Sequence, residues 1–333
     1  MAAAKRVTIT DIARIARVSP GAVSFALNGK PGVSEETRER ILQVAREQQW
    51  QPSHVARSLV GARANAVGLA LNRPARSLGT EAFFTDLIAG IQSGLSDARI
   101  GLHLQLVSSL EEELEIHRQW HASRQVDGVL VIDPLGDDPR IDALRELQMP
   151  TILVGSHVAV PSALWVDDTE TASTLFGHLR GLGHSHIAYV AGPAVLQHTR
   201  LRARVLGGQV IHTDFSPGMA AEQTRRLLNG DDRPTAIVYD NDVMAVAGLR
   251  AVQEMGVGVP ADVSLASFDD SVIAGLVRPS ITAMTRDTFE LGDRSARLLV
   301  RQIASDVVLP GEAGPAPVLT VRESTGRPGT VSG

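Results

Sequence analysis

Short apolar runs alternate with amphipathic segments through most of the chain beyond residue 64, and this alternation restricts the fold more than any other feature. The apolar runs have the length of strands, whereas the longer segments between them have the spacing of helices. A strand, helix, strand order is typical of a parallel sheet. The strands are expected at 66–71, 101–107, 128–132, 151–155 and 163–166, and the helices at 84–97, 110–124 and 140–148.

The same alternation returns in a second half. Strands are expected near 187–191, 236–239, 264–268 and 283–285, and helices near 169–182, 219–228 and 242–255. Two similar halves predict two doubly wound parallel-sheet subdomains, with a cleft between them where ligands lie at the carboxyl ends of strands. A Pro/Gly-rich loop at 310–317 precedes a last strand at 318–322, and residues 324–333 are expected to fray.

The first fifty residues have a different pattern, that of three short helices. Thr10 can cap a first helix that carries Asp11 in its first turn, Ser19 with Pro20 begins a second, and Ser34 begins a third that ends near residue 48. Two short helices this close predict an all-α helix-turn-helix domain, although a plain helical hairpin would look similar. The expected apolar faces consist of Ile12, Ala13, Ile15 and Ala16, then Ala22, Val23, Ala26 and Leu27, then Ile41, Leu42, Val44 and Ala45.

The charge distribution also changes near residue 63, where the helical segment gives way to the alternating strands and helices. Residues 1–63 hold ten Lys and Arg against five Asp and Glu, a net charge of +5, whereas the whole chain carries −5 and the remainder therefore −10. This polarity is expected when one end approaches a polyanion, although ordinary surface scatter could also produce it. The chain has no cysteine, which fits a cytoplasmic location. We find no export signal and no apolar run near the roughly 20 residues that span a bilayer.

Patterns that carry enzyme chemistry are absent. The sequence contains no GxGxxG, no GxxxxGK[ST] and no GxSxG, so we expect no enzyme and no cofactor. His117 and His121 have the spacing of one helix face, but without an HExxH pattern they indicate a solvated face rather than a metal site. Asp167 and Asp168 could touch a ligand, yet adjacent strand residues point to opposite faces and make a poor catalytic pair.

The N-terminal motifs resemble those of the LacI/GalR family of bacterial transcription regulators. They are VTITDIA (7–13), VS (18–19), VS (23–24), LN (27–28), VS (33–34) and TR (37–38), followed by WQPS (50–53) and VARSL (55–59). Further motifs of the family extend the resemblance to about residue 322. They are LGH (182–184), IA (187–188), GP (192–193), RPTA (233–236), ND (241–242), VP (259–260), DVS (262–264) and FDD (268–270).

The resemblance implies a division of the chain and a fold. It places a helix-turn-helix DNA-binding domain at 1–50, a hinge helix and linker at 51–63, and an effector-binding and dimerisation domain of the periplasmic-binding-protein-like type at 64–333. The N-subdomain would comprise 64–165 and 286–317, and the C-subdomain 166–285 and 318–328.

For DNA, the resemblance places the start of the recognition helix at Ser19 and the base-reading positions at Pro20, Gly21 and Phe25. Pro20 and Gly21 have no polar side chain for a bidentate base contact, so specificity must rest on apolar contact with thymine methyls, on Ser24 or backbone groups, and on DNA shape. The candidates for positioning on phosphates, each of which could equally be a cap or a solvated residue, are Thr8, Ser19, Ser24, Asn28 and Arg38.

The segment 51–61 is too short to be a stable helix alone. The resemblance implies that it folds on DNA, with Ala56 approaching the minor groove and Leu59 acting as the apolar wedge between base steps. The alternative is a plain linker with one exposed leucine.

For the effector, the resemblance implies that Phe83 and Phe84 line the N-terminal wall of the cleft, Phe215 stacks on the ligand, and Asn241 and Asp269 hydrogen-bond to it. The alternatives are that the phenylalanines belong to the core and that the two polar residues are caps. Both polar residues follow expected strands, which favours ligand contact.

The family's effector-contacting arginine fits either Arg202 or Arg204. Relatives place a helix and then a strand after it, whereas Arg204 is followed by too few residues for both. Either the helix is missing or the segment is rebuilt locally, so a DNA-binding regulator with a degenerate effector pocket is an alternative function. A solute-binding protein, the third reading, would need an export signal and no helix-turn-helix.

The sequence therefore predicts a homodimeric repressor in the cytoplasm, associated with the nucleoid. Its expected partners are double-stranded operator DNA and a small effector, a sugar or related metabolite. Effector closure of the cleft would change the spacing of two DNA-binding heads and thereby the operator affinity.

Overall fold

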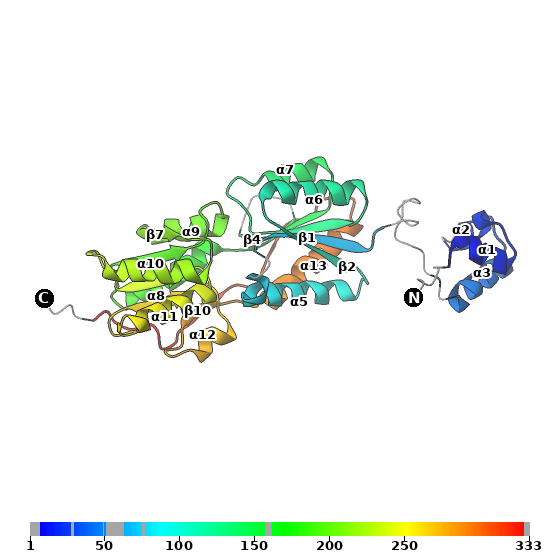
Figure 1. Ribbon diagram of the computed structural model, residues 1–333. Helices are drawn as coiled ribbons and strands as arrows, with labels where there is room; N and C mark the ends of the chain where they lie inside the picture. The colour runs from blue at the N-terminus through cyan, green and yellow to red at the C-terminus, as the bar shows by residue number, and fades with distance from the viewer. Residues whose placement is uncertain are drawn as a thin grey trace. The chain divides into compact units, whose positions relative to one another are not determined.

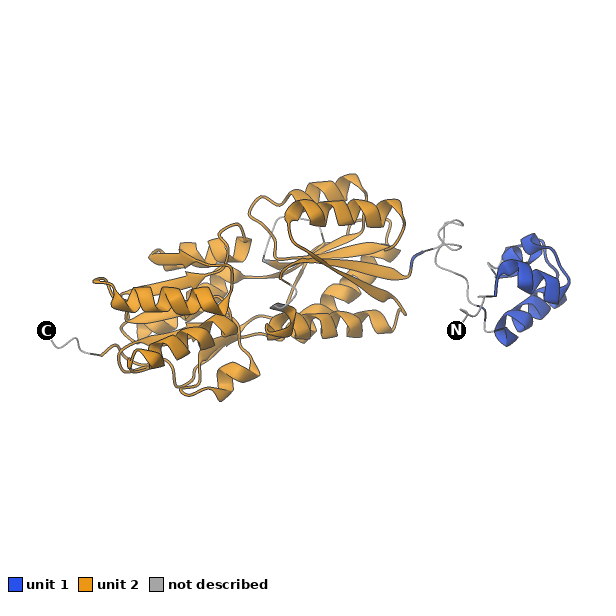
Figure 2. Ribbon diagram, viewed as in Figure 1, with its two compact units in different colours: residues 1–64 blue, residues 65–333 orange. Residues whose placement is uncertain are grey.

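The computed structural model describes residues 7–27, 30–48, 50, 63–74, 77–156 and 162–329. The chain divides into two compact units, residues 1–64 and 65–333 (Figure 2). The expected hinge helix lies outside the described residues, as do Asn28, Ala56 and Leu59.

The first unit contains the three expected helices, α1 (Ile9–Ala16), α2 (Pro20–Leu27) and α3 (Glu35–Glu47). The expected caps Ser19 and Ser34 are confirmed, since their hydroxyls accept backbone N–H groups of α2 and α3. Thr10 as the first cap is wrong. Thr8 caps α1 instead, because it forms a reciprocal box in which the Asp11 N–H donates to the Thr8 hydroxyl at 3.3 Å and the Thr8 N–H donates to the Asp11 carboxylate at 2.9 Å.

One small core holds these three helices together. Most of the expected apolar positions are buried or half-buried, but Ile15 is 40% exposed, because α2 and α3 cover only the opposite side of α1. Arg38 joins α3 to the end of α2, since its guanidinium donates to the carbonyl oxygens of Ala26 at 3.2 Å and Lys30 at 2.9 Å. The buried core residues are Ile12, Ala13, Ala16, Val23, Ala26, Ile41, Val44 and Ala45.

The second unit contains two six-stranded sheets, which we call the N-lobe and the C-lobe (Figure 1). The N-lobe sheet is parallel, in the order β11-β5-β4-β3-β1-β2; the C-lobe sheet is parallel except for β12, in the order β12-β10-β9-β8-β6-β7. The N-lobe strands are β1 (Ala66–Asn72), β2 (Gly101–Val107), β3 (Gly128–Ile132), β4 (Thr151–Ser156), β5 (Ala163–Val166) and β11 (Glu312–Ala313). The C-lobe strands are β6 (Ile187–Ala191), β7 (Gln209–His212), β8 (Ala236–Tyr239), β9 (Ser264–Ser267), β10 (Thr282–Thr285) and β12 (Val318–Thr320).

Helices cover both sheets, and the chain passes between the lobes after β5, β10 and β11. The strands and helices expected from the sequence are confirmed to within a few residues, whereas β7, β11, α9, α12 and α13 were not foreseen. The N-lobe helices are η1 (Ser77–Gly79), α5 (Ala82–Ser96), α6 (Leu110–Ala122), α7 (Pro139–Glu146) and α13 (Thr288–Ala304). The C-lobe helices are α8 (Asp168–Gly181), α9 (Gln197–Leu206), α10 (Pro217–Asn229), α11 (Asp242–Glu254) and α12 (Val272–Leu276). No helix in the described part of the chain is long and apolar enough to cross a membrane.

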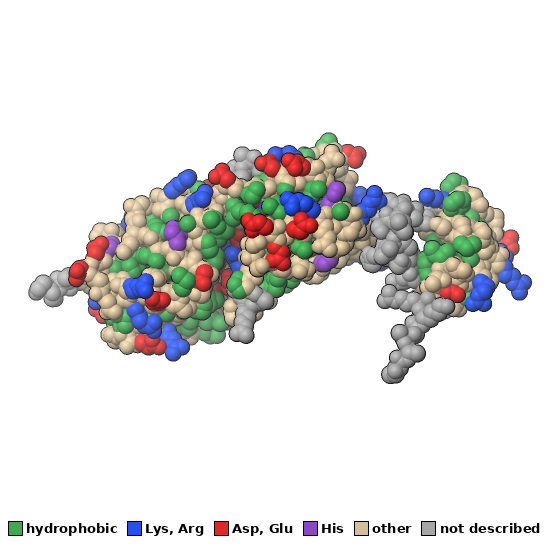
Figure 3. Space-filling model, turned by 45° about the horizontal axis from the view of Figure 1, so that its top comes forward, with side chains coloured by type: hydrophobic (Ala, Val, Ile, Leu, Met, Phe, Trp, Pro, Cys, Tyr) green, Lys and Arg blue, Asp and Glu red, His purple; other side chains and the backbone are tan. Residues whose placement is uncertain are grey.

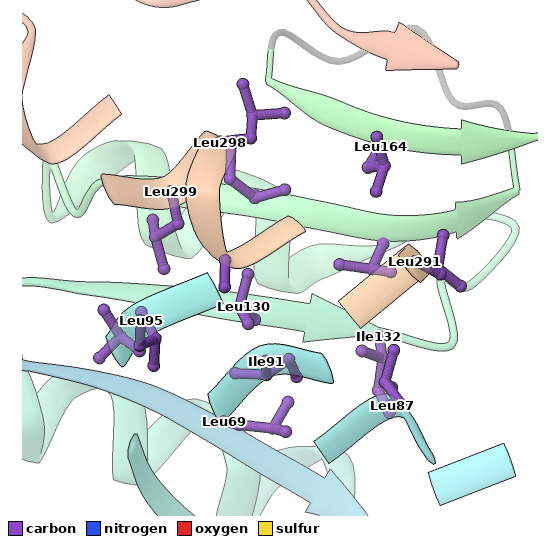
Figure 4. Close-up of a cluster of buried hydrophobic side chains, with 14 of the residues drawn as sticks. Leu69, Leu87, Ile91, Leu95, Leu130, Ile132, Leu164, Leu291, Leu298 and Leu299 are labelled. Carbon is purple, nitrogen blue, oxygen red and sulfur yellow. The ribbon is translucent and has the colours of Figure 1, made fainter. Parts of the chain in front are cut away.

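The N-lobe core lies between its sheet and the helix pair α5 and α13 (Figure 4). Leu87 and Ile91 of α5 and Leu298 of α13 lie among strand residues such as Leu130. Because α5 carries Phe83 and Phe84 in its first turn, this packing fixes where those rings lie.

On the other face of the N-lobe sheet, α6 buries polar side chains as well as apolar ones. His117 is 1% exposed, so the expectation that it lies on a solvated face is wrong, whereas His121 one turn later is exposed as expected. The physical reason is that α6 turns the side carrying Glu113, His117 and Trp120 inward, where Arg140 donates to Glu113 at 2.8 Å. Within the described residues no three His, Asp or Glu side chains are grouped to hold a metal ion.

The burial of His117 predicts a pH-dependent stability. Burial first, and then the charge of Arg140, lowers the pKa of His117 to about 4, although Asp138 acts in the opposite direction. Because the unfolded chain binds this proton near pH 6.5, the stability is fully present above that pH and falls as the pH drops to about 4, by about 3 kcal/mol. We expect His117→Leu to remove this part of the acid destabilisation in urea unfolding curves between pH 7 and 4. His121→Gln is the matched control, and an identical pH profile for His117→Leu and wild type would contradict the assignment.

Candidate functional site: the cleft between the lobes

The cleft of the second unit lies at the carboxyl ends of strands from both lobes, as the sequence predicts for this fold. Arg73 follows β1, Asp133 follows β3, Asp240 follows β8 and Asp269 follows β9 shortly after its end. Parallel strands bring these chain positions to one edge of each sheet, and the two edges face each other across the cleft.

Arg202 organises the C-lobe side. Its guanidinium donates to Asp168 at 2.7 and 3.0 Å and to Asp240 at 2.5 Å, and it lies over the ring of Phe268 at 4.4 Å. Burial alone would raise the pKa of both carboxyls, but Arg202 outweighs it and holds each pKa below its usual range. Arg202 is 4% exposed. Because its guanidinium is buried between Asp168 and Asp240, it holds these two carboxylates in position.

Two other carboxyls of the cleft titrate near neutral pH. Burial raises the pKa of Glu81 to about 7 although Arg73 opposes it, and burial raises the pKa of Asp269 to about 6 although Arg286 opposes it. Near pH 7 these side chains can therefore accept hydrogen bonds, and the protonated fraction of each can also donate one.

Several hydrogen-bond donors of the cleft have no partner of their own. They are Nδ2 of Asn241, Nε of Arg73, and Nε and Nη2 of Arg286. Nη2 of Arg286 lies 3.4 Å from the Asp269 carboxylate without forming a hydrogen bond. Buried donors without a partner cost free energy unless a ligand or water satisfies them.

Asn241 is a helix cap, as one interpretation of the sequence expects, and its side chain also lines the cleft. Its Oδ1 accepts the N–H of Met244 at 2.8 Å and so caps α11. Its Nδ2 is buried, unpaired and part of the cleft lining. The cap fixes the side chain, and the fixed side chain presents its amide donor to the cleft.

Phenyl rings line both walls. Phe83 and Phe84 meet edge to face at 5.3 Å on the N-lobe side, and Phe215 lies on the C-lobe side. Arg73 is placed between the walls, 5.5 Å from the centre of the Phe84 ring and 4.7 Å from that of Phe215. Phe215 adopts φ 68°, and Gly192 makes room for it, because a Cβ there would lie 2.2 Å from the ring.

The free space in the cleft is small. It amounts to about 70 Å³, enough for a few waters and less than the roughly 300 Å³ or more of a usual ligand pocket. Two backbone hydrogen bonds join the lobes, from Gly136 N to Val195 O at 3.2 Å and from Gln197 N to Pro134 O at 2.8 Å. A ligand larger than a few waters therefore requires the lobes to separate or the Arg73 and Phe215 side chains to move.

The structure resolves the difficulty after Arg204. Too few residues follow Arg204 for a whole helix and a strand, as expected, but the helix is not missing: α9 begins at Gln197, before the arginines, and β7 follows a two-residue turn at Gly207 and Gly208. Arg202 faces the cleft, whereas Arg204 is exposed on the outer side of α9, because residues two apart on a helix point about 200° apart.

All the other cleft residues proposed from the sequence, Phe83, Phe84, Phe215, Asn241 and Asp269, line the cleft. Their contacts with a ligand remain predictions. Sequence reasoning missed Arg73, Glu81, Asp133, His198, Asp240 and Arg286. The rule that ligands lie at the carboxyl ends of strands could have found Asp133 and Asp240, because each directly follows an apolar run.

In the first unit, the residues expected to contact DNA have different local roles. Thr8 and Ser19 are caps, and Arg38 donates to backbone carbonyls. Pro20, Gly21 and Phe25 are exposed on α2 and Ser24 is half-buried. Their DNA contacts stay predictions.

A three-helix unit with a basic bias, followed in the chain by a two-lobed unit with a polar cleft between its lobes, is typical of a DNA-binding transcription regulator of the ligand-responsive class. Residues 8–53 match the bacterial regulatory proteins of the lacI family, and residues 176–325 match the periplasmic binding protein-like domain. The transcriptional regulator CelR of Thermobifida fusca is 30% identical, over 96% of this chain and 98% of its own. The chain belongs to the lacI family of bacterial regulatory proteins.

Solved structures agree. A lac repressor dimer bound to operator and an anti-inducer is 26% identical, covers 97% of this chain with all of its own, and has a TM-score of 0.81. A complex of CelR with cellobiose is 28% identical, covers 96% of this chain with all of its own, and has a TM-score of 0.71. These relatives are transcription regulators, so the prediction that the chain is a DNA-binding regulator and no enzyme is confirmed.

Proposed function

We propose that this chain is a repressor that binds operator DNA as a homodimer, and that a neutral, hydroxyl-rich molecule of the sugar class controls it from the interlobe cleft. In this proposal residues 1–50 bind the major groove, 51–63 form the hinge, and 64–333 bind the effector and the partner copy. Bound to operators, the protein would be associated with the nucleoid in the cytoplasm.

One observation supports a sugar-like effector: the cleft combines unpaired hydrogen-bond donors, the carboxyls of Glu81 and Asp269 and several phenyl rings. Hydroxyl groups can satisfy donors and acceptors at once, and the apolar face of a sugar ring packs on phenyl rings. Acids outnumber arginines in the lining, since Glu81, Asp133, Asp168, Asp240 and Asp269 face only Arg73, Arg202 and Arg286. This excess disfavours a phosphorylated or carboxylate ligand, and the cellobiose held by CelR agrees with a neutral one.

An exposed apolar face supports the homodimer. On α12, Val272, Ile273 and Leu276 are 78%, 55% and 71% exposed. Three large apolar side chains together on a five-residue helix are typical of a surface that a partner covers. A second copy of the chain could cover it symmetrically, as paired operator half-sites require.

The effector proposal predicts a ligand-dependent rise in melting temperature. Neutral mono- and disaccharides are screened against their phosphorylated counterparts by thermal shift with the full chain. A neutral sugar at 100 times its Kd is expected to stabilise by about 2.7 kcal/mol, whereas the phosphorylated forms should have little effect. Stabilisation by phosphorylated sugars alone would contradict a neutral ligand.

Asn241→Ser tests the site itself. Serine retains an oxygen that can cap α11 but removes the unpaired Nδ2 donor, so the Kd for the sugar should rise about fivefold to tenfold with little change in ligand-free stability. Asn229→Ser, at an exposed position at the end of α10, is the matched control.

If no sugar stabilises a protein that still binds its operator, the degenerate-pocket alternative holds.

A further inference from the structure

The recognition helix α2 presents an unusually apolar surface. Its eight residues, Pro20–Leu27, contain one polar side chain, that of Ser24, which is half-buried. Pro20, Gly21 and Phe25 are the exposed positions, and Phe25 is 43% exposed. A single exposed ring is common on protein surfaces, but Pro20, Gly21 and Phe25 leave α2 with no fully exposed polar side chain, so whatever α2 contacts meets an apolar surface.

The Phe25 ring packs against the turn that follows α2. Gly32 has φ 115° in the turn after α2, and a Cβ at that position would lie 3.2 Å from the ring. The N–H of Lys30 donates to the carbonyl oxygen of Phe25 at 2.9 Å, and Arg38 donates to the carbonyl oxygen of Lys30. These hydrogen bonds hold the turn against α2, and the contact with Gly32 fixes the position of the Phe25 ring.

Charge favours nucleic acid as the partner of this surface. Arg17 just before α2 and Lys30 just after it are exposed, and residues 1–63 carry a net charge of +5. Such cations can contact phosphates and bring the helix to the duplex, but phosphate contacts do not read sequence. In the major groove, side-chain reading of the bases must therefore come from what α2 itself exposes, and that surface is apolar.

Resting on the proposed operator binding, we propose that Phe25 reads the operator through the C5-methyl group of a thymine in the major groove of each half-site. The thymine methyl is the apolar group that the four bases present in the major groove, and an aromatic side chain recognises it by contact alone. Specificity at this position requires no hydrogen bond from the protein.

Uracil substitution tests the proposal, because uracil lacks only the C5-methyl and keeps every hydrogen-bonding atom of thymine. An operator is first selected by the full chain from a random duplex pool. Each thymine is then replaced by uracil, symmetrically in both half-sites, and Kd is measured at fixed salt. Removing a buried methyl should weaken binding about fourfold per half-site at one thymine position.

Combining Phe25→Ala with the uracil substitution gives a double-mutant cycle. This variant changes an exposed side chain, so the unit should keep its helical circular dichroism, and its Kd should no longer distinguish thymine from uracil at that position. Phe289→Ala, an equally exposed ring on α13, should retain the full difference. The cycle separates methyl contact from altered DNA shape, since a shape effect would persist in Phe25→Ala.

Two results would overturn the inference. One is equal affinity for thymine and uracil at every position of a specifically bound operator, and the other is a uracil effect that survives in Phe25→Ala. Failure to select any operator would instead refute the proposed function, so the two failures are distinguishable.

Discussion

Arg202→Ala is expected to lower the free energy of unfolding by about 3 to 5 kcal/mol, because it leaves the buried carboxylates of Asp168 and Asp240 without their shared cation. Asp240 would keep only neutral donors, which are the hydroxyl of Tyr189 at 2.5 Å, the N–H of Gly192 at 2.7 Å and the hydroxyl of Thr199 at 3.3 Å. Urea unfolding of the full chain at pH 7, followed by circular dichroism, measures the loss.

Arg204→Ala is the matched control for that experiment. It removes the same side chain two residues later, from the exposed side of α9, and should change the free energy of unfolding by no more than about 0.5 kcal/mol. Equal costs for the two variants would show that the ion pairs of Arg202 do not stabilise the C-lobe. Because Asp168 and Asp240 line the cleft, we also expect Arg202→Ala to weaken effector binding.

Gly90→Ala is the second large effect, with an expected loss of about 3 kcal/mol. A Cβ at Gly90 of α5 would lie 2.0 Å from the carbonyl oxygen of Phe289 on α13. Backbone cannot yield as a flexible side chain does, so the two helices must separate. The loss is measured as a shift of the urea midpoint.

Gly177→Ala is the control, since Gly177 of α8 is also helical but has nothing within 4 Å of its Cβ position. There alanine should stabilise by up to about 1 kcal/mol, because it favours the helix. If both substitutions stabilise, the α5 and α13 helices are not as close as the structure has them. Separation of these helices would also displace Phe83 and Phe84 at the start of α5, and so weaken effector binding.

Much of the fold could be predicted because periodicity and capping act locally. Ser19 and Ser34 mark helix starts from their own side chains, and the apolar runs of β3 and β6 are buried at every position. The helix α13 could have been predicted too, since Asp287 caps it and Leu291, Leu298 and Leu299 form a helical stripe. The short strands β7 and β11 pair mainly because neighbouring strands lie beside them, and local sequence carries little trace of this.

The candidate site also contains residues that the sequence predicted and residues that only the tertiary structure brought together. The sequence alone determined that parallel strands end at a cleft, because strand direction and chain order fix which ends meet, and its resemblance to the family placed Asn241 and Asp269 there. Only the tertiary structure decided that Arg202 rather than Arg204 faces inward, that His117 is buried, and that Arg73 and Arg286 join the cleft. Their roles depend on which residues from distant parts of the chain lie within a few ångströms, and that distance is set by packing rather than by spacing along the sequence.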